Sequence, residues 1–424
     1  MSIIRRLSGL EILDSRGRPT VQATCELESG AVGTASVPSG ASTGAAEARE
    51  LRDGDPGRYG GFGCRMAVRN VNETLNTLLA GRAFGDQEEL DRALLDADGT
   101  EDKSRLGANA LLAVSLAFCR AQALERSEPL YRQMACMLGE ADISGRLPRP
   151  AINLFSGGKH AGGQVPLQDV LVVPIAASTM DEALAMTYAV YQAAAAFVGE
   201  QYGMRLLTAD EGGLAPPFES IQAMLDATVA SIEAAGYVPG NDVALAIDVA
   251  SSHFFRDGRY HLGEVSLDGS AMVRQLVDWL DRYPILSIED GLAEEDWTHW
   301  PELRAVVGGR ALVVGDDLLC TNPGRIRRAV EAGAADALLL KVNQVGTLTE
   351  AAEAYRLARE AGWQVIVSAR SGETEDNWLA DLAVGWQGDQ IKIGSITQSE
   401  RLAKYNRLLQ IEAGTRMPLA LLVR

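Results

Sequence analysis

The segment "ALVVGDDLLCTNPGRIRRAVEAGAADALLLKVN" (residues 311–343) contains two short apolar runs that each end in a charged residue. Asp316 ends the first run, and Lys341 ends the second run 25 residues later. Between them, Asn322-Pro323 is a typical helix start and Gly333 a typical helix end. The segment therefore predicts one strand–helix–strand unit with parallel strands buried on both faces.

The same plan recurs along most of the chain. Apolar runs alternate with helical segments, and each run ends in a polar or charged residue. Many such units in succession predict a (β/α)8-type barrel, whose functional residues follow the carboxyl ends of the strands. A doubly wound sheet is the alternative, but it would not normally place charged residues at so many successive strand ends. The runs end at Asp248, Glu289, Asp316, Lys341, Arg370 and Lys392, at intervals of 41, 27, 25, 29 and 22 residues.

The beginning of the chain has a different pattern. "TVQATCELESGAVGTASVPSG" (residues 20–40) reads as two strands joined by a turn at Gly30, and residues 104–126 carry an Ala/Leu stripe at helical spacing. The Gly- and Pro-rich run "GEADISGRLPRP" (residues 139–150) marks a domain boundary. We therefore expect a smaller α+β N-terminal domain over residues 1–138, and a C-terminal barrel domain with the active site over residues 139–424.

Composition narrows the class of protein. The 424 residues carry a net charge of −18, which argues against nucleic acid or an anionic membrane as the main partner. The five cysteines show no CxxC spacing and indicate free thiols in a reducing compartment. No signal peptide is apparent, and the longest apolar stretch, residues 183–200, is interrupted by polar side chains and predicts a buried helix. These features predict a cytoplasmic protein.

Three carboxylates end consecutive predicted strands. Asp248, Glu289 and Asp316 would converge at the mouth of a barrel, and three hard oxygen ligands suit Mg²⁺. Any one of these residues alone could equally be a helix cap or a surface charge. Their common place at the strand ends favours a metal site.

An acid and a base can also be identified. Lys341 ends the apolar run "ALLLK". Burial and a nearby cation would lower the pKa of this lysine and make it a general base. The alternative is a snorkelling lysine, whose charged end reaches the solvent. Glu211 lies in "TADEGGLAPP", where two glycines let the backbone approach a ligand. Arg370 and Ser371 could bind a phosphate group, and Lys392 adds positive charge. The segment "VPSGASTG" (residues 37–44) has the composition of a flexible lid. Together they indicate proton abstraction next to a carboxylate, assisted by a divalent metal.

Several motifs carry a family resemblance over nearly the whole chain. In order they include "LDSRGRPTV", "VPSGASTGAAEARELRDGD", "ADEGGLAP", "SIEDGLAEEDW", "LLLKVNQVGTLTE" and "SGETEDNWLADLAVG". The chain thereby resembles the enolase family. The resemblance implies a carbon–oxygen lyase of the hydro-lyase type, a barrel with an irregular start, two Mg²⁺ ions per active site, and a homodimer or higher homo-oligomer.

The resemblance also assigns roles to residues. It makes Lys341 the proton acceptor and Glu211 the proton donor. Asp248, Glu289 and Asp316 correspond to the Mg²⁺ ligands, and Ser39 to a lid serine that reaches the second Mg²⁺. The positions that correspond to substrate-binding or active-site residues are His160, Gln168, Asp169, Arg370, Ser371 and Lys392.

The chain departs from the family pattern in four places. Ala369 stands where the family has histidine, Asp169 where it has glutamate, and Ser156 where it has asparagine; residues 392–396 read "KIGSI" instead of "KTGAP". One interpretation is a glycolytic lyase that converts 2-phosphoglycerate into phosphoenolpyruvate. A second is a specialised paralogue with a bulkier phosphonate substrate, similar to the carboxyphosphonoenolpyruvate synthases of phosphonate antibiotic biosynthesis. A third is a non-catalytic structural or surface-binding homologue.

Overall fold

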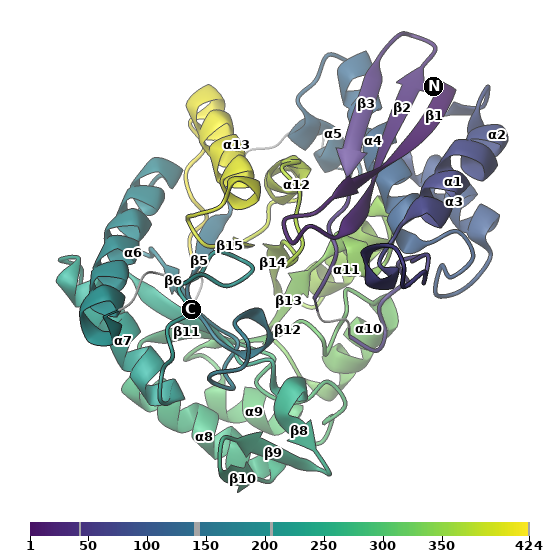
Figure 1. The fold of residues 1–424 in the computed structure, drawn as a ribbon. Coiled ribbons are helices and arrows are strands. Elements are labelled where there is room, and N and C mark those ends of the chain that lie inside the picture. Colours follow the sequence, from purple (N-terminus) through teal and green to yellow (C-terminus); the bar gives the residue numbers. More distant parts are fainter. Residues whose placement is uncertain (42–43, 140–144, 204–206, 423–424) are drawn as a thin grey trace.

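The computed structural model describes residues 1–41, 44–139, 145–203 and 207–422 (Figure 1). Part of the predicted lid, residues 42–43, lies outside the described residues. The same is true of residues 140–144, next to the predicted domain boundary. The boundary between residues 138 and 139 therefore stays a prediction.

The N-terminal part is a four-stranded sheet covered by helices. The strand order is β3-β2-β1-β4, and β1 pairs antiparallel with β2 and β4. Helix α4 packs on β2 and β3, where a Cβ on Gly33 would lie 2.2 Å from the backbone oxygen of Ala117, so only glycine permits the close approach. The elements are β1 (Ser2–Leu13), β2 (Pro19–Leu27), β3 (Val32–Ser36), η1 (Tyr59–Gly61), α1 (Arg65–Arg69), η2 (Asn70–Leu75), α2 (Asn76–Leu79), β4 (Ala83–Phe84), α3 (Gln87–Asp98), α4 (Ala108–Glu125) and α5 (Leu130–Cys136).

The rest of the chain forms a closed eight-stranded barrel, which confirms the predicted fold and excludes the doubly wound sheet. The ring order is β11-β12-β13-β14-β15-β5-β6-β7. Strand β6 is antiparallel to both neighbours, whereas the other pairs are parallel, so the barrel does start irregularly. The strands are β5 (Arg149–Ser156), β6 (Asp169–Val173), β7 (Ala244–Asp248), β11 (Ile285–Glu289), β12 (Leu312–Gly315), β13 (Ala337–Leu340), β14 (Gln364–Ser368) and β15 (Gln390–Gly394).

Helices surround the barrel strands (Figure 1). Their caps follow the sequence: Asn322 accepts hydrogen bonds from the N–H groups of Gly324 and Arg325, and Gly333 adopts φ 65°. The helices are α6 (Met180–Tyr202), α7 (Ile221–Ala234), α8 (Gly269–Arg282), α9 (Trp300–Val307), α10 (Pro323–Ala332), α11 (Leu348–Glu360), α12 (Trp378–Gly385) and α13 (Ser399–Thr415). Shorter elements are η3 (Gly158–His160), η4 (Ser251–Phe254), η5 (Val342–Gln344) and the small sheet of β8 (Phe255–Arg256), β9 (Arg259–Leu262) and β10 (Val265–Leu267).

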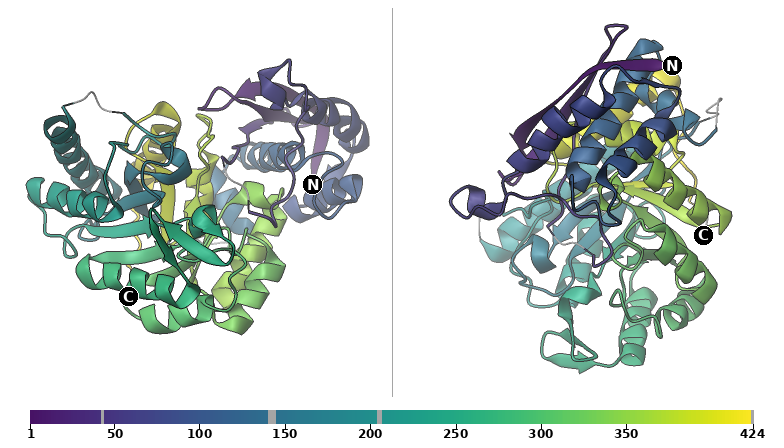
Figure 2. Two further views of the ribbon diagram at one scale, coloured as in Figure 1. Left: turned by 60° about the horizontal axis from the view of Figure 1, so that its bottom comes forward. Right: turned by 90° about the vertical axis from the view of Figure 1, so that its right-hand side faces the viewer.

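The N-terminal part lies against one side of the barrel (Figure 2). Asp91 on α3 accepts hydrogen bonds from the backbone and side chain of Thr349 on α11, at 2.9 and 2.7 Å. Ser39 forms an isolated bridge with Gly372, beyond the end of β14. The Ser39 bridge brings this part of the N-terminal chain to the mouth of the barrel. Within the described ranges, we find no helix with the length and hydrophobicity of a membrane span.

Candidate active site at the mouth of the barrel

The predicted functional residues lie at the carboxyl ends of the barrel strands. Asp248 and Glu289 are the last residues of β7 and β11 and are paired in register. Asp316 directly follows β12, and Lys341 directly follows β13. Lys392 lies within β15 and, like Asp248, Glu289 and Asp316, is at least 93% buried, whereas the side chain of Lys341 is 14% exposed. Because parallel strands end at one edge of the barrel, these residues share one site.

Lys392 joins two of the predicted metal ligands. Its Nζ donates to Asp248 Oδ2 at 2.9 Å and to both carboxylate oxygens of Glu289 at 2.8 Å. Burial opposes the charge on Lys392, but Asp248 and Glu289 outweigh it and raise the pKa of the ammonium. Burial would raise the pKa of Asp248, but Lys392 lowers it to about 2. Burial and the neighbouring Asp248 carboxylate raise the pKa of Glu289.

The third predicted ligand, Asp316, contacts the predicted base. Asp316 Oδ2 accepts a short hydrogen bond from Lys341 Nζ, and Oδ1 accepts from Gln344 Nε2 at 3.3 Å. Burial alone would lower the pKa of Lys341, but the charge of Asp316 outweighs it and the pKa is raised. This direction is opposite to the lowered pKa expected from the sequence, because Lys341 and Asp316 form an ion pair.

Two further carboxylates in this region were missed. Asp290 accepts the backbone N–H groups of Asp316 and Asp317 at 2.9 and 2.8 Å. Carboxylate oxygens of these three residues lie within 4.8 Å of one another. Burial, followed by the charge of Asp316, raises the pKa of Asp317 to about 7. The doubled acidic pairs Glu289-Asp290 and Asp316-Asp317 could have indicated them, but only one residue per strand was considered.

The donor set fits Mg²⁺, which is the metal that the sequence resemblance implies. Asp248, Glu289 and Asp316 offer only hard oxygen atoms. Gln168 donates from Nε2 to Asp248 at 3.0 Å, while its buried Oε1 has no hydrogen-bond partner among the described residues. The lid residue Ser39 is placed differently: its hydroxyl contacts Glu50 and Arg52, at 2.9 and 2.7 Å.

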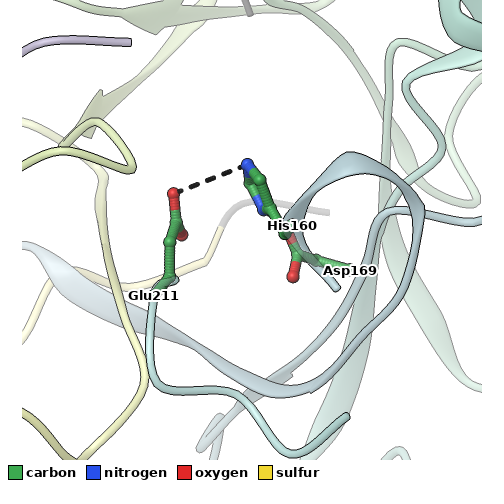
Figure 3. Close-up of side chains that lie close together, drawn as sticks. All are labelled: His160, Asp169 and Glu211. Atoms are coloured by element: carbon green, nitrogen blue, oxygen red, sulfur yellow. Dashed lines mark hydrogen bonds and ion pairs between the residues drawn. The ribbon is translucent and has the colours of Figure 1, made fainter. Parts of the chain in front are cut away.

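The predicted acid lies on the other side of the mouth. Asn153 Nδ2 donates to Glu211 Oε2 at 3.1 Å, and His160 Nε2 lies 3.9 Å from Glu211 Oε1 (Figure 3). The other ring nitrogen of His160 is 2.9 Å from Asp169 Oδ2. Burial disfavours the imidazolium, but Asp169 and then Glu211 outweigh it and raise the pKa of His160 to about 9. His160 is therefore charged at neutral pH.

Two departures from the family pattern contact each other. Ser156 Oγ donates to Asp169 Oδ1 at 2.5 Å. The other oxygen of Asp169 is used by His160, so both oxygens of this buried carboxylate contact protein groups. In this arrangement Asp169 and Ser156 act as one unit that orients His160.

The predicted anion-binding arginine also contacts the N-terminal domain. Arg370 Nη1 and Nη2 donate to the two oxygens of Glu47 at 3.1 and 3.2 Å, and Nη1 also donates to Asn343 Oδ1 at 2.9 Å. The hydroxyl of Ser371 accepts from Arg16 Nη1 at 3.0 Å. Glu47 lies 323 residues from Arg370 in the sequence and Arg16 lies 355 residues from Ser371, so no local sequence pattern indicates these contacts.

These groups enclose a small polar cavity. All the predicted site residues line it except Asp169, Glu289 and Ser39. Its free volume is about 30 Å³, about that of one water molecule in the liquid. An anionic substrate therefore requires some of the side chains to move, and the ion pairs between them are the contacts that it would replace.

Comparison with protein families agrees with this geometry. Fold and site define a TIM barrel with acid–base and oxygen-donor groups at its mouth. Residues 4–134 match the family model described as "Enolase, N-terminal domain", and residues 144–416 match "Enolase, C-terminal TIM barrel domain". The two matches span almost the whole chain, and the chain belongs to the enolase family. This membership supports an enolase-type lyase in general.

Proposed function

We propose that this protein is a Mg²⁺-dependent lyase that removes water from 2-phosphoglycerate, or a close analogue, to give phosphoenolpyruvate or a related enolpyruvate ester. The observation that carries the proposal is that Lys341 and Glu211 line one cavity from different sides. Lys341 follows β13, whereas Glu211 contacts β5, three strands away around the ring of eight. A substrate between them would have a base on one side and an acid on the other.

Lys341 is the proposed proton acceptor. Because the ion pair with Asp316 raises the pKa of Lys341, this ammonium must first lose a proton. The neutral Nζ then takes the proton next to the substrate carboxylate, the electrons of the broken C–H bond form the new C=C bond, and the C–O bond to the leaving hydroxyl breaks. Asp316 is the group that sets the charge of Lys341, since it is the closest carboxylate. Mg²⁺, bound by Asp248, Glu289 and Asp316, would supply positive charge that stabilises the negative charge developing on the substrate.

Glu211 and His160 are the proposed proton donors to the leaving hydroxide. Burial raises the pKa of Glu211, but His160 outweighs it and the pKa is lowered, so the proton lies mainly on His160 at neutral pH. The 3.9 Å between His160 Nε2 and Glu211 Oε1 allows the pair to share that proton. Transfer of this proton to the departing hydroxyl releases water.

A direct assay tests the proposal. The purified protein with Mg²⁺ and 2-phosphoglycerate should produce the absorbance of an enol product. Lys341→Ala should reduce the rate by about 10² to 10⁴, the usual contribution of a general base. Lys103→Ala is the matched control, because Lys103 pairs with Glu350 away from the cavity. An unchanged rate in Lys341→Ala would disprove the assignment of the base.

A specialised phosphonate substrate is the second candidate, and Ala369 favours it. Its side chain lines the cavity, and its backbone N–H donates to the oxygen of Lys392 at 2.8 Å. A methyl group here leaves more room than an imidazole would. Activity on a phosphonate analogue that exceeds activity on 2-phosphoglycerate would decide for a phosphonate pathway and against glycolysis.

We also expect a cytoplasmic homodimer or higher homo-oligomer that acts on a small anionic phosphorylated or phosphonate substrate. Neither nucleic acid nor a membrane is expected as a partner, because the net charge of −18 would repel both nucleic acid and an anionic membrane. A non-catalytic homologue would not need Mg²⁺, so calorimetric binding of Mg²⁺ separates that alternative from an enzyme.

A further inference from the structure

A buried arginine contacts the backbone of the predicted anion-binding residues. Arg401, on α13, is 0% exposed. Its Nη1 donates to the backbone oxygen of Arg370 at 2.6 Å, and its Nη2 donates to the backbone oxygen of Ser371 at 2.5 Å. Nη1 also donates to the backbone oxygen of Ile393, at 3.0 Å. One guanidinium group therefore joins the residues that follow β14 to a residue of β15.

These contacts lie where the chains of β14 and β15 separate. The N–H of Ala369 still donates to the backbone oxygen of Lys392, at 2.8 Å. Three residues after Ala369, the N–H of Gly372 donates to the N-terminal domain at 3.0 Å, whereas the N–H of Ser395 donates at 2.8 Å to the backbone oxygen of the proposed acid. The two chains thus turn to different partners, and Arg401 holds them together at the point of separation.

The position of Arg401 is unfavourable for a positive charge. It lies in the first turn of α13, where the helix dipole disfavours a cation, and burial removes water from the guanidinium. An ion pair with Glu400, at 3.3 Å from Nε to Oε1, offsets part of this cost. An apolar side chain would avoid the cost but could not donate hydrogen bonds. The guanidinium supplies several donors in one rigid plane, which allows it to bind carbonyl oxygens of two strands at once.

The neighbouring backbone leaves room for this arginine. Gly394 has φ 122°, and a Cβ at this position would lie 2.9 Å from Arg401 Cδ. Another residue at position 394 would therefore push the arginine away from the strand ends. The hydroxyl of Tyr405, one turn further along α13, donates to the backbone oxygen of Gly394 at 2.9 Å. The surrounding structure thus specifies where the guanidinium lies.

The two strand ends carry different cations of the site. The side chains of Arg370 and Lys392 both line the cavity, whereas Arg401 is not among the lining residues. Binding of a small anion depends on the placement of the groups that contact it. We infer that Arg401 is a positioning residue, which fixes the backbone of Arg370 and Ser371 relative to Lys392 without itself touching the substrate.

This inference deepens the proposed function and rests on it only in placing a phosphoryl group at Arg370. The contacts of Arg401 explain how a short loop after β14 can present a guanidinium and a hydroxyl in a fixed arrangement. They also link this loop to α13, which lies outside the barrel.

Binding of inorganic phosphate to the full-length Mg²⁺-loaded protein tests the inference. Calorimetry separates two effects, because the stoichiometry reports the fraction of folded sites and the dissociation constant reports their geometry. Arg401→Lys keeps the buried charge but cannot reach the carbonyl oxygens of both strands, so it should bind phosphate about tenfold more weakly than the wild type. The KM for 2-phosphoglycerate should rise by a similar factor, and kcat should change less.

Arg407→Lys is the matched control on the same helix. Arg407 donates from Nε and Nη2 to the two oxygens of Asp381, at 2.8 and 2.6 Å, and neither residue lines the cavity. This variant should keep the dissociation constant for phosphate and the KM for 2-phosphoglycerate, even where it lowers the melting temperature.

The inference is overturned if Arg401→Lys binds phosphate as tightly as the wild type, if only the stoichiometry falls, if the wild type does not bind phosphate, or if Arg407→Lys weakens binding equally. Failure of Arg401→Lys to fold would assign Arg401 to the stability of the core and would also overturn it. Failure of the proposed function would look different: 2-phosphoglycerate would give no enolpyruvate ester with the wild type, whereas the difference in phosphate affinity would remain.

Discussion

Glu47 of the N-terminal domain and Arg370 of the barrel form a two-pronged ion pair with N···O distances of 3.1 and 3.2 Å. Both side chains are buried, at 6% and 4% exposed. Gln344 Nε2 lies 3.3 Å from both Glu47 Oε1 and Asp316 Oδ1, and Asp316 in turn contacts Lys341. A continuous chain of contacts therefore joins the predicted anion-binding arginine to the predicted base through a residue of the other domain.

We predict that Glu47→Gln raises the KM for 2-phosphoglycerate about tenfold, or about 1.4 kcal/mol, because Arg370 loses the carboxylate that orients its guanidinium. The effect on kcat should be smaller. Steady-state kinetics measures both.

Glu11→Gln is the control for this prediction. Glu11 forms an ion pair with Arg58 in the same domain, away from the cavity, and its loss should leave KM unchanged. A lower KM in Glu47→Gln would contradict the prediction and would mean that Glu47 competes with the substrate for Arg370.

We predict that Asp316→Asn weakens Mg²⁺ binding and turnover together, because it removes one charged oxygen ligand and leaves Lys341 without its closest carboxylate. Titration calorimetry and the rate of water elimination are the two measurements. Glu353→Gln, at an exposed ion pair with Arg327, should alter neither. Normal Mg²⁺ affinity in Asp316→Asn would place the metal elsewhere.

Asp91 makes the contact between the domains dependent on pH. Burial raises the pKa of this carboxyl to about 6 against an ordinary 3.8, so the folded protein holds its proton more tightly than the unfolded chain does. The resulting stability is fully present below pH 3.8 and is lost as pH rises through about 6. The shift corresponds to at most about 3 kcal/mol.

Asp91→Asn should remove this dependence. Denaturant unfolding at pH 4 and pH 7 should show a smaller loss of stability in the variant than in the wild type. Glu88→Gln, an exposed position on the same helix, should behave as the wild type does. Equal pH dependence in Asp91→Asn and the wild type would show that Asp91 does not titrate in this range.

Ala369 and Asp169 replace the histidine and glutamate of the family pattern. If the protein is specialised for another substrate, Ala369→His combined with Asp169→Glu should raise the rate of dehydration of 2-phosphoglycerate tenfold or more, equivalent to about 1.4 kcal/mol of barrier. Because Ser156 Oγ lies 2.5 Å from Asp169 Oδ1, the longer glutamate also needs room there. The double change should therefore work better when Ser156→Ala is added, which removes the hydroxyl at that contact.

The comparison is the rate of each variant against that of the wild type, with the same substrate and Mg²⁺. A native protein that is already fast, and gains nothing from the changes, would rule out specialisation. Ala369 and Asp169 would then be neutral replacements in an ordinary active site.

The sequence by itself determined the barrel and the caps of its helices. Alternating apolar runs and helical segments are local patterns, and Asn322 and Gly333 act on the helix that they adjoin. It also placed charged residues at the strand ends, because parallel strands of a barrel end at one edge.

Only the tertiary structure decided which of these groups contact one another. The pairing of Lys392 with Asp248 and Glu289, and of Lys341 with Asp316, depends on the order in which the ring closes. The contact between Glu47 and Arg370 depends on the docking of a separate domain. Charge and burial act through space, so the protonation of these groups follows from distances that no local pattern of residues contains.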